Sequence, residues 1–223
     1  MYKMTNQEIL SRVDHTLLKA SASWEDIQKI AEQGLTYKTA SICIPPSHVR
    51  QVSNVFKGLN ICTVIGFPLG YNLKEVKMRE AEEALACGAA ELDMVINLGH
   101  VKSQGFDAVL DEISSLKKIT GNKILKVIIE TCYLTNEEKI RLCKIVSEAG
   151  ADFIKTSTGF GSAGAVMEDI ILFKEHIDFN VKIKAAGGIK TREDMEAFLN
   201  AGCGRLGTSS AIAILAGKEG KSY

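Results

Sequence analysis

Short runs of β-branched and aliphatic residues alternate along the chain with longer segments whose apolar residues recur at helical spacing. Between the short runs, residues 72 to 87 and 135 to 149 show the helical pattern, and the second segment has Thr135 and Glu138 at the positions of a capping box. The pattern predicts eight strands, near residues 12 to 15, 38 to 44, 60 to 66, 90 to 96, 123 to 130, 152 to 156, 181 to 185 and 204 to 207.

Eight strand and helix units in 223 residues average about 28 residues each, close to the lower end for a (β/α)8 TIM barrel. A glycine that should end a helix in the left-handed conformation recurs about every two units, at Gly34, Gly88, Gly150 and Gly202. A doubly wound open sheet is the less favoured alternative. We expect an α/β fold in which residues 1 to 223 form one barrel domain, with a short polar tail from about residue 217 to 223.

The composition is that of an ordinary globular protein, with 46% hydrophobic and 24% charged residues. Basic and acidic residues balance at 27 each, so no overall charge indicates a nucleic-acid partner or an anionic membrane surface. The first residues, MYKMTNQEIL, lack the basic start and apolar stretch of a signal peptide. We therefore expect a cytoplasmic protein with no nucleic-acid or membrane partner.

The cysteines and histidines give no metal-binding pattern. Six scattered cysteines form no CxxC pair, as expected of reduced thiols packed like small apolar residues. The four histidines show no HExxH motif or other close pairing, so a metal site would need ligands from distant parts of the chain. We expect neither a metal nor a cofactor.

Lys155 stands at the end of an apolar run, in the string ADFIKTSTGFG (residues 151 to 161). Its amine should lie where a strand emerges into a loop, which is where a barrel has its active site. A lysine there can remain a cation that binds phosphate or an ion-pair partner, or it can lose its proton and attack a carbonyl group.

A second lysine, Lys184, reaches the same end of the next strand in VKIKAAGGIKT. Two like charges about 4 Å apart repel by roughly 4 kcal/mol at an effective dielectric constant near 20, which corresponds to about three pKa units. Such a neighbour could hold Lys155 neutral, as Schiff-base lysines require. Lys182 has the same strand parity but lies nearer the start of the strand, so Lys184 is favoured.

Asp93 lies in the apolar string ELDMVINLG, where a charge must be paired or functional. Strand alternation places it on one face with Glu91, from which it can point into the barrel toward Lys155. Asp93 could equally be a structural partner of Lys126 or Glu130, the charged residues of LKVIIE.

The loops after the last two predicted strands are rich in glycine and serine. Unpaired backbone amides in such loops bind anions, and TIM barrels often hold phosphate there. Ordinary helix capping by the serines is the alternative. We expect the phosphate-binding residues to be Gly159, Gly187, Gly188, Ser209 and Ser210.

Seven strings occur in order along nearly the whole chain: DHTLLKA, SICIPP, LDMVIN, LKVIIET, ADFIKTSTGF, KAAGGIKT and GTSS. Together they resemble the deoxyribose-phosphate aldolase family. The resemblance implies a metal-free class I aldolase on a (β/α)8 barrel. Such an enzyme reversibly cleaves 2-deoxy-D-ribose 5-phosphate to D-glyceraldehyde 3-phosphate and acetaldehyde, in the catabolism of deoxyribose phosphate.

The resemblance also implies roles for three residues. Lys155 would form the Schiff base, Lys184 would tune that amine and transfer protons, and Asp93 would be an acid/base group. Two positions depart from the family pattern: Phe160 stands where longer members often have a lysine, and Lys182 stands where a small residue is more usual.

Further expectations concern the tail, the partners and the competing functions. Tyr223 could fold over the barrel mouth as an accessory acid/base group, or belong to a frayed terminus. The expected partner is a small sugar phosphate, and base rates favour a homodimer. Two other functions fit the pattern: a sugar-phosphate isomerase or synthase in which Lys155 stays a cation, and a noncatalytic barrel that binds a phosphate ligand.

Overall fold

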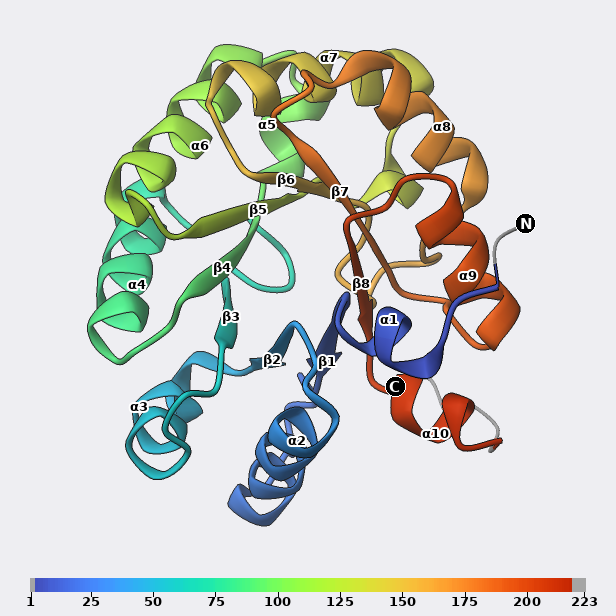
Figure 1. Cartoon of the computed structure of the whole chain (residues 1–223). Helices are drawn as coiled ribbons and strands as arrows, with labels where there is room; N and C mark the ends of the chain where they lie inside the picture. The colour runs from blue at the N-terminus through green and yellow to red at the C-terminus, as the bar shows by residue number, and fades with distance from the viewer. Residues whose placement is uncertain (1–2, 218–223) are drawn as a thin grey trace.

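Eight parallel strands form a closed barrel in the computed structural model, which describes residues 3–217. The strands follow one another around the barrel in chain order, and β8 closes it by pairing with β1 (Figure 1). This closure confirms the TIM barrel and excludes the open sheet. The strands are β1 Val13–Thr16, β2 Ser41–Ile44, β3 Ile61–Ile65, β4 Glu91–Val95, β5 Ile124–Ile128, β6 Phe153–Lys155, β7 Lys182–Ala186 and β8 Arg205–Thr208.

Helices surround the strands as an outer ring (Figure 1). Near the chain ends, α1 lies against α9 and α10. The helices are α1 Asn6–Leu10, α2 Trp24–Tyr37, α3 Pro46–Val55, α4 Lys74–Ala86, α5 Leu98–Lys102, α6 Phe106–Thr120, η1 Thr131–Tyr133 (a 3-10 turn), α7 Asn136–Glu148, α8 Met167–His176, α9 Arg192–Asn200 and α10 Ala211–Leu215.

All eight predicted strands overlap the observed ones, and the capping box of Thr135 and Glu138 begins α7 as predicted. Three of the four helix-ending glycines have the expected positive φ, at Gly88, Gly150 and Gly202. The prediction for Gly34 is wrong, because this residue lies inside α2. A Cβ atom at Gly34 would stand 2.6 Å from Ile42 Cγ2, so close packing of α2 on β2 requires the glycine.

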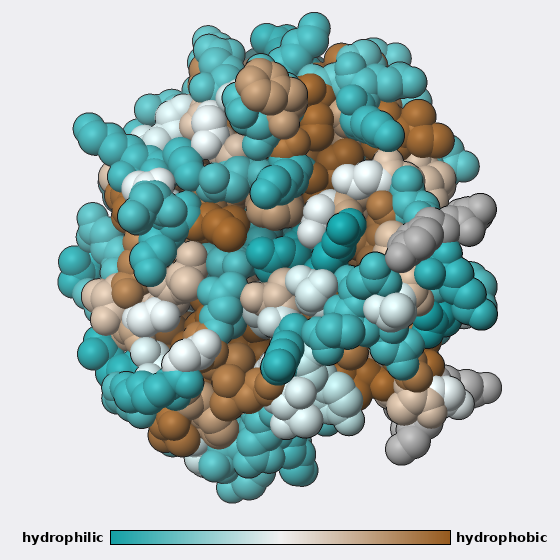
Figure 2. All heavy atoms as spheres, in the orientation of Figure 1, coloured by the Kyte–Doolittle hydropathy of each residue, from teal (hydrophilic) through white to brown (hydrophobic). Residues whose placement is uncertain are grey.

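Apolar residues fill the space between strands and helices, whereas charged residues occupy much of the barrel interior. The main buried cluster includes outward-facing strand residues such as Leu92, Met94 and Val127. Asp14, Asp93 and other charged side chains are buried inside the barrel. Hydrophobic and hydrophilic residues are interspersed on the visible surface (Figure 2). Among the described residues, no helix is long and apolar enough to cross a membrane.

Candidate active site

The carboxylate of Asp93 is the meeting point of three lysine side chains inside the barrel. Oδ2 of Asp93 accepts hydrogen bonds from Lys155 Nζ and Lys184 Nζ, both at 2.7 Å. Its Oδ1 atom accepts one from Lys126 Nζ at 2.9 Å. Register explains the arrangement, because Lys155 is paired with Lys184 across β6 and β7, and Asp93 with Lys126 across β4 and β5.

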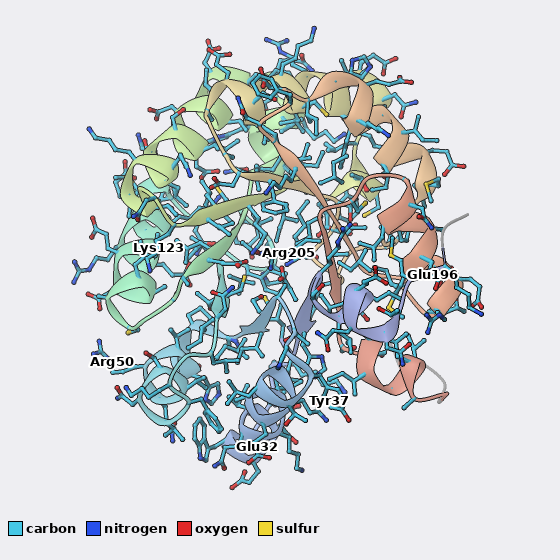
Figure 3. All side chains as sticks on the ribbon, viewed as in Figure 1. Glu32, Tyr37, Arg50, Lys123, Glu196 and Arg205 are labelled. Atoms are coloured by element: carbon cyan, nitrogen blue, oxygen red, sulfur yellow. The ribbon has the colours of Figure 1, made fainter. Side chains whose placement is uncertain are left out.

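Asp14 and Glu91 extend this ion network toward the start of the strands. Lys126 Nζ lies 2.5 Å from Glu91 Oε2 and 3.5 Å from Asp14 Oδ2, and Lys184 Nζ lies 2.5 Å from Asp14 Oδ2. Arg205 pairs with both carboxylates and is seen near the centre of the ring of strands in Figure 3. A continuous network of charges therefore runs along the barrel axis.

The network holds Asp93 and Lys184 in their charged states. Burial alone would raise the pKa of Asp93, but Lys126, Lys155 and Lys184 outweigh it and hold the pKa well below its usual range. Burial alone would lower the pKa of Lys184, but Asp14 and Asp93 outweigh it and raise the pKa above its usual value. Lys184 is therefore a cation that touches the same oxygen atom as Lys155.

A pocket at the carboxyl ends of the strands contains Lys155 and all five predicted phosphate-binding residues. It encloses about 670 Å³, part of it open to solvent, within the usual size range of ligand pockets. Lys155 itself is 3% exposed, so its amine lies at the bottom of the pocket. The lining residues are Thr16, Leu18, Lys155, Thr158, Gly159, Ala186, Gly187, Gly188, Ile189, Lys190, Gly207, Thr208, Ser209 and Ser210.

Two successive glycines form the turn after β7 on one side of this pocket. Gly187 and Gly188 have φ values of 78° and 72°, a region that other residues enter at a cost of about 1–2 kcal/mol. The backbone of Gly187 also approaches Gly164 closely, since a Cβ atom on Gly164 would lie 2.3 Å from the Gly187 carbonyl carbon. Here α10 starts directly after Ser210, which makes no side-chain capping bond to the helix.

Glu130 supports the loop that follows Lys155. Its carboxylate accepts the N–H of Thr158 at 3.1 Å and also the Thr158 hydroxyl. Glu130 holds a left-handed backbone conformation, with φ at 54°, which is uncommon for a residue other than glycine. Burial raises the pKa of Glu130 despite these two hydrogen bonds. Of the two structural partners considered for Asp93, Lys126 contacts it and Glu130 is bonded to Thr158 instead.

The two residues that depart from the family pattern lie outside the ion network. Lys182 is exposed, and its Nζ lies 5.8 Å from the ring centroid of Phe153, so it does not compete with Lys184 for Asp93. Phe160 makes an edge-to-face contact with Phe67, with ring centroids 5.3 Å apart. Tyr223 lies outside the described residues.

Sequence reasoning missed Asp14 and Arg205, which pair with Lys184 and with the carboxylates of the network. Their signal was present, because each is a charged residue within a short predicted strand. It also missed Lys190, a second lysine that lines the pocket.

Two groups of possible metal ligands lie at the network: Cys43 with Cys62 and Asp93, and Asp14 with Cys62 and Glu91. The six cysteines are free, and Cys43 and Cys62 are buried at paired positions of β2 and β3. Lys126 and Cys62 both donate to Asp93 Oδ1, so a cation would have to displace them. Asp14 and Glu91 are likewise paired with Lys126 and Arg205, so these cations make both groups a poor match for a metal ion.

Comparison with known proteins assigns the chain to a family. The model of the DeoC/LacD family of aldolases matches residues 9–216. A deoxyribose-phosphate aldolase of Clostridium botulinum (strain Alaska E43) is 59% identical, covering 99% of this chain and 100% of the relative. One from Clostridioides difficile is 52% identical, covering 97% and 100%.

Solved structures agree with these relatives. The tetrameric deoxyribose phosphate aldolase of Aeropyrum pernix superposes with a TM-score of 0.89 at 32% identity, covering 95% of this chain and 91% of that one. An aldolase named QR15 superposes with a TM-score of 0.90 at 40% identity, covering 94% and 95%. The match spans the barrel and every strand of the ion network, and on this evidence the chain belongs to the DeoC/LacD family of aldolases.

Proposed function

We propose that this aldolase reversibly cleaves 2-deoxy-D-ribose 5-phosphate to D-glyceraldehyde 3-phosphate and acetaldehyde through a Schiff base on Lys155. One observation carries the proposal: the Lys155 amine lies in a pocket lined by glycine-rich loops and shares a carboxylate oxygen with the cation Lys184. The relatives named above support the substrate. The proposed metabolic role is the breakdown of deoxyribose phosphate.

The covalent step requires a neutral amine on Lys155. Lys184 opposes protonation of that amine because the two nitrogens contact the same oxygen atom of Asp93. The neutral amine attacks C1 of the open-chain sugar, and Lys184 supplies the proton with which the carbinolamine hydroxyl leaves as water. The product is an iminium ion covalently bound to Lys155.

Cleavage of the carbon chain requires removal of the proton from the C3 hydroxyl. Asp93 starts as a carboxylate, because its pKa is well below its usual range, and it accepts this proton directly or through a water molecule. The C2–C3 bond then breaks, its electrons move toward the iminium nitrogen, and glyceraldehyde 3-phosphate leaves. The remaining enamine is protonated at C2, and hydrolysis releases acetaldehyde.

The loops after β6, β7 and β8 hold the phosphate in this proposal. Backbone amides near Gly159, Gly187 and Gly188 and the hydroxyls of Ser209 and Ser210 line the same pocket as Lys155. Binding the phosphate there fixes the position of C1 relative to the amine.

Borohydride reduction in the presence of acetaldehyde tests the proposal. The hydride converts an iminium into a stable secondary amine, so mass spectrometry should find one ethyl group on Lys155 and none on Lys182. A Lys155→Ala variant should acquire no adduct at the site. An isomerase, a synthase or a noncatalytic phosphate-binding barrel would give no adduct, and an adduct on Lys184 would contradict the assignment.

Three expectations from the sequence remain predictions: the cytoplasmic location, the homodimer and the role of Tyr223. If Tyr223 transfers the C2 proton, its removal should slow deuterium exchange at C2 of acetaldehyde. An unchanged exchange rate would end that idea.

A further inference from the structure

The ion network contains more positive than negative charge. Within residues 3–217, the interior network joins four cations to three carboxylates when all are ionised: Lys126, Lys155, Lys184 and Arg205 with Asp14, Glu91 and Asp93. Every side chain of the network is buried or nearly so. Unbalanced charge in such an interior is unfavourable, so loss of one proton from a lysine would relieve the excess.

Lys155 is the lysine with the weakest support for its charge. Among the described residues, its ion pair is with Asp93 alone. By contrast, Lys126 pairs with Asp93, Glu91 and Asp14, and Lys184 pairs with Asp93 and Asp14. Both oxygens of Asp93 are shared, so Lys155 receives only part of the stabilisation that one carboxylate can give.

We propose that Lys126 is a positioning residue that keeps the Lys155 amine neutral by holding the Oδ1 side of Asp93. The inference rests on the proposed Schiff-base function and assigns a role to a lysine that lies one layer below the reacting amine. Lys126 is suited to this role because it is fully buried and fixed by three carboxylates. These carboxylates outweigh burial and hold its pKa above the usual value, so it remains a cation.

Charged and titratable groups from seven strands or their ends, all but β6, surround Lys126 and Lys155. Glu130 is a fourth carboxyl group that interacts electrostatically with Lys155, but burial raises its pKa and it is bonded to Thr158. The complete set is Asp14 on β1, Cys43 on β2, Cys62 on β3, Glu91 and Asp93 on β4, Glu130 after β5, Lys184 on β7 and Arg205 on β8. Apart from Lys126, the cations of this set are Lys184 and Arg205, and Arg205 is bonded to Asp14 and Glu91 rather than Asp93.

Replacement of Lys126 by Met tests the proposal through the pH dependence of cleavage. Without Lys126, Asp93 interacts more strongly with Lys155 and stabilises the positive charge on its amine, so less of the reactive form is present at low pH. The acid limb of the plot of kcat/KM against pH should move to higher pH by about one unit. At a fixed pH on that limb, kcat/KM should fall about tenfold. The rate at high pH should return close to that of the unchanged enzyme.

Two further variants separate this effect from damage to the structure. Lys126→Arg keeps the charge and should leave the acid limb in place. The double variant Lys126→Met with Glu91→Gln removes one charge of each sign. Its acid limb should therefore lie closer to that of the unchanged enzyme than the acid limb of Lys126→Met alone. If Lys126→Met fails to fold, Lys126→Gln makes the same test, because its amide removes the charge but still donates hydrogen bonds to the carboxylates.

An acid limb that stays in place in Lys126→Met or Lys126→Gln would overturn the proposal. An equal shift in the double variant would also overturn it, because charge would then not be the cause. Borohydride trapping of the unchanged enzyme is measured alongside. If the unchanged enzyme forms no adduct, the Schiff-base function itself is refuted. If it forms an adduct on Lys155 but the acid limb of the Lys126 variants does not shift, only the role of Lys126 is refuted.

Discussion

Replacing Gly188 by alanine should weaken phosphate binding and leave the chemistry at Lys155 intact. Gly188 has φ at 72°, and an alanine there costs about 1–2 kcal/mol of folding free energy. A Cβ atom would lie 3.8 Å from Gly164 Cα, an ordinary contact, so backbone strain is the main effect. At about 2–4 °C per kcal/mol for a chain of this size, Tm should fall by roughly 2–8 °C.

Strain in this turn should move the backbone amides that we assign to the phosphate. A hydrogen bond to a charged group contributes about 1.5–3 kcal/mol, so losing one should raise KM by about ten- to a hundredfold. The comparison substrate is 2-deoxyribose without its phosphate. Its kcat/KM should change by less than about twofold, because that sugar never made the lost contact.

Gly150→Ala provides the matched control. Gly150 has φ at 70°, nothing within 4 Å of an added Cβ atom, and a position before β6 at the other end of the barrel. It should lose stability as Gly188→Ala does and keep its KM. The assay is cleavage coupled to reduction of acetaldehyde, the product that both sugars release, with Tm from circular dichroism. An unchanged KM in Gly188→Ala, or an equal loss with the unphosphorylated sugar, would refute the phosphate assignment.

Three further outcomes can be checked on single variants. Lys184→Met removes the positive charge that shares Asp93 Oδ2 with Lys155 and should move the acid limb of kcat/KM to higher pH, whereas Lys182→Met, on the same strand but exposed at the other end, should leave it in place. If the maximal kcat/KM falls but the acid limb of the pH profile stays in place, Lys184 transfers protons without tuning the Lys155 amine. Thr135→Ala should lower the free energy of unfolding by about 1 kcal/mol, measured by urea denaturation, and leave kcat unchanged; a loss below about 0.3 kcal/mol would count against the observed cap. Burial raises the pKa of the Cys143 thiol to about 12, so thiol reagents should label it at neutral pH only as the protein unfolds; rapid labelling of the native protein would contradict that burial.

Local pattern was enough to predict the elements and three residues of the site. Alternation within β4 placed Asp93 toward the barrel interior, and the matching ends of β6 and β7 brought Lys155 and Lys184 together. These arguments need only the period of a strand and the order of parallel strands. They therefore work on a single sequence.

The rest of the network depends on closure of the barrel. Asp14 is 170 residues from Lys184 along the chain, and they meet because β8 pairs with β1 and brings β7 near it. Arg205 reaches Glu91 across the interior, a contact that no local spacing encodes. Gly34 shows a different limit, since a glycine near the end of a helix can serve close packing instead of a left-handed turn.

The groups that we propose to react and those that we propose to bind phosphate belong to different kinds of structure. Lys155, Lys184 and Asp93 stand on strands whose backbone is fixed on both sides by hydrogen-bonded neighbours. Gly188 stands on the loop between β7 and α9, and Ser209 on the segment between β8 and α10, where no neighbouring strand fixes the backbone. Engineering can therefore treat them as separable modules: exchanging the connections should change which acceptor aldehyde is accepted, while the strands continue to make and break the same carbon–carbon bond.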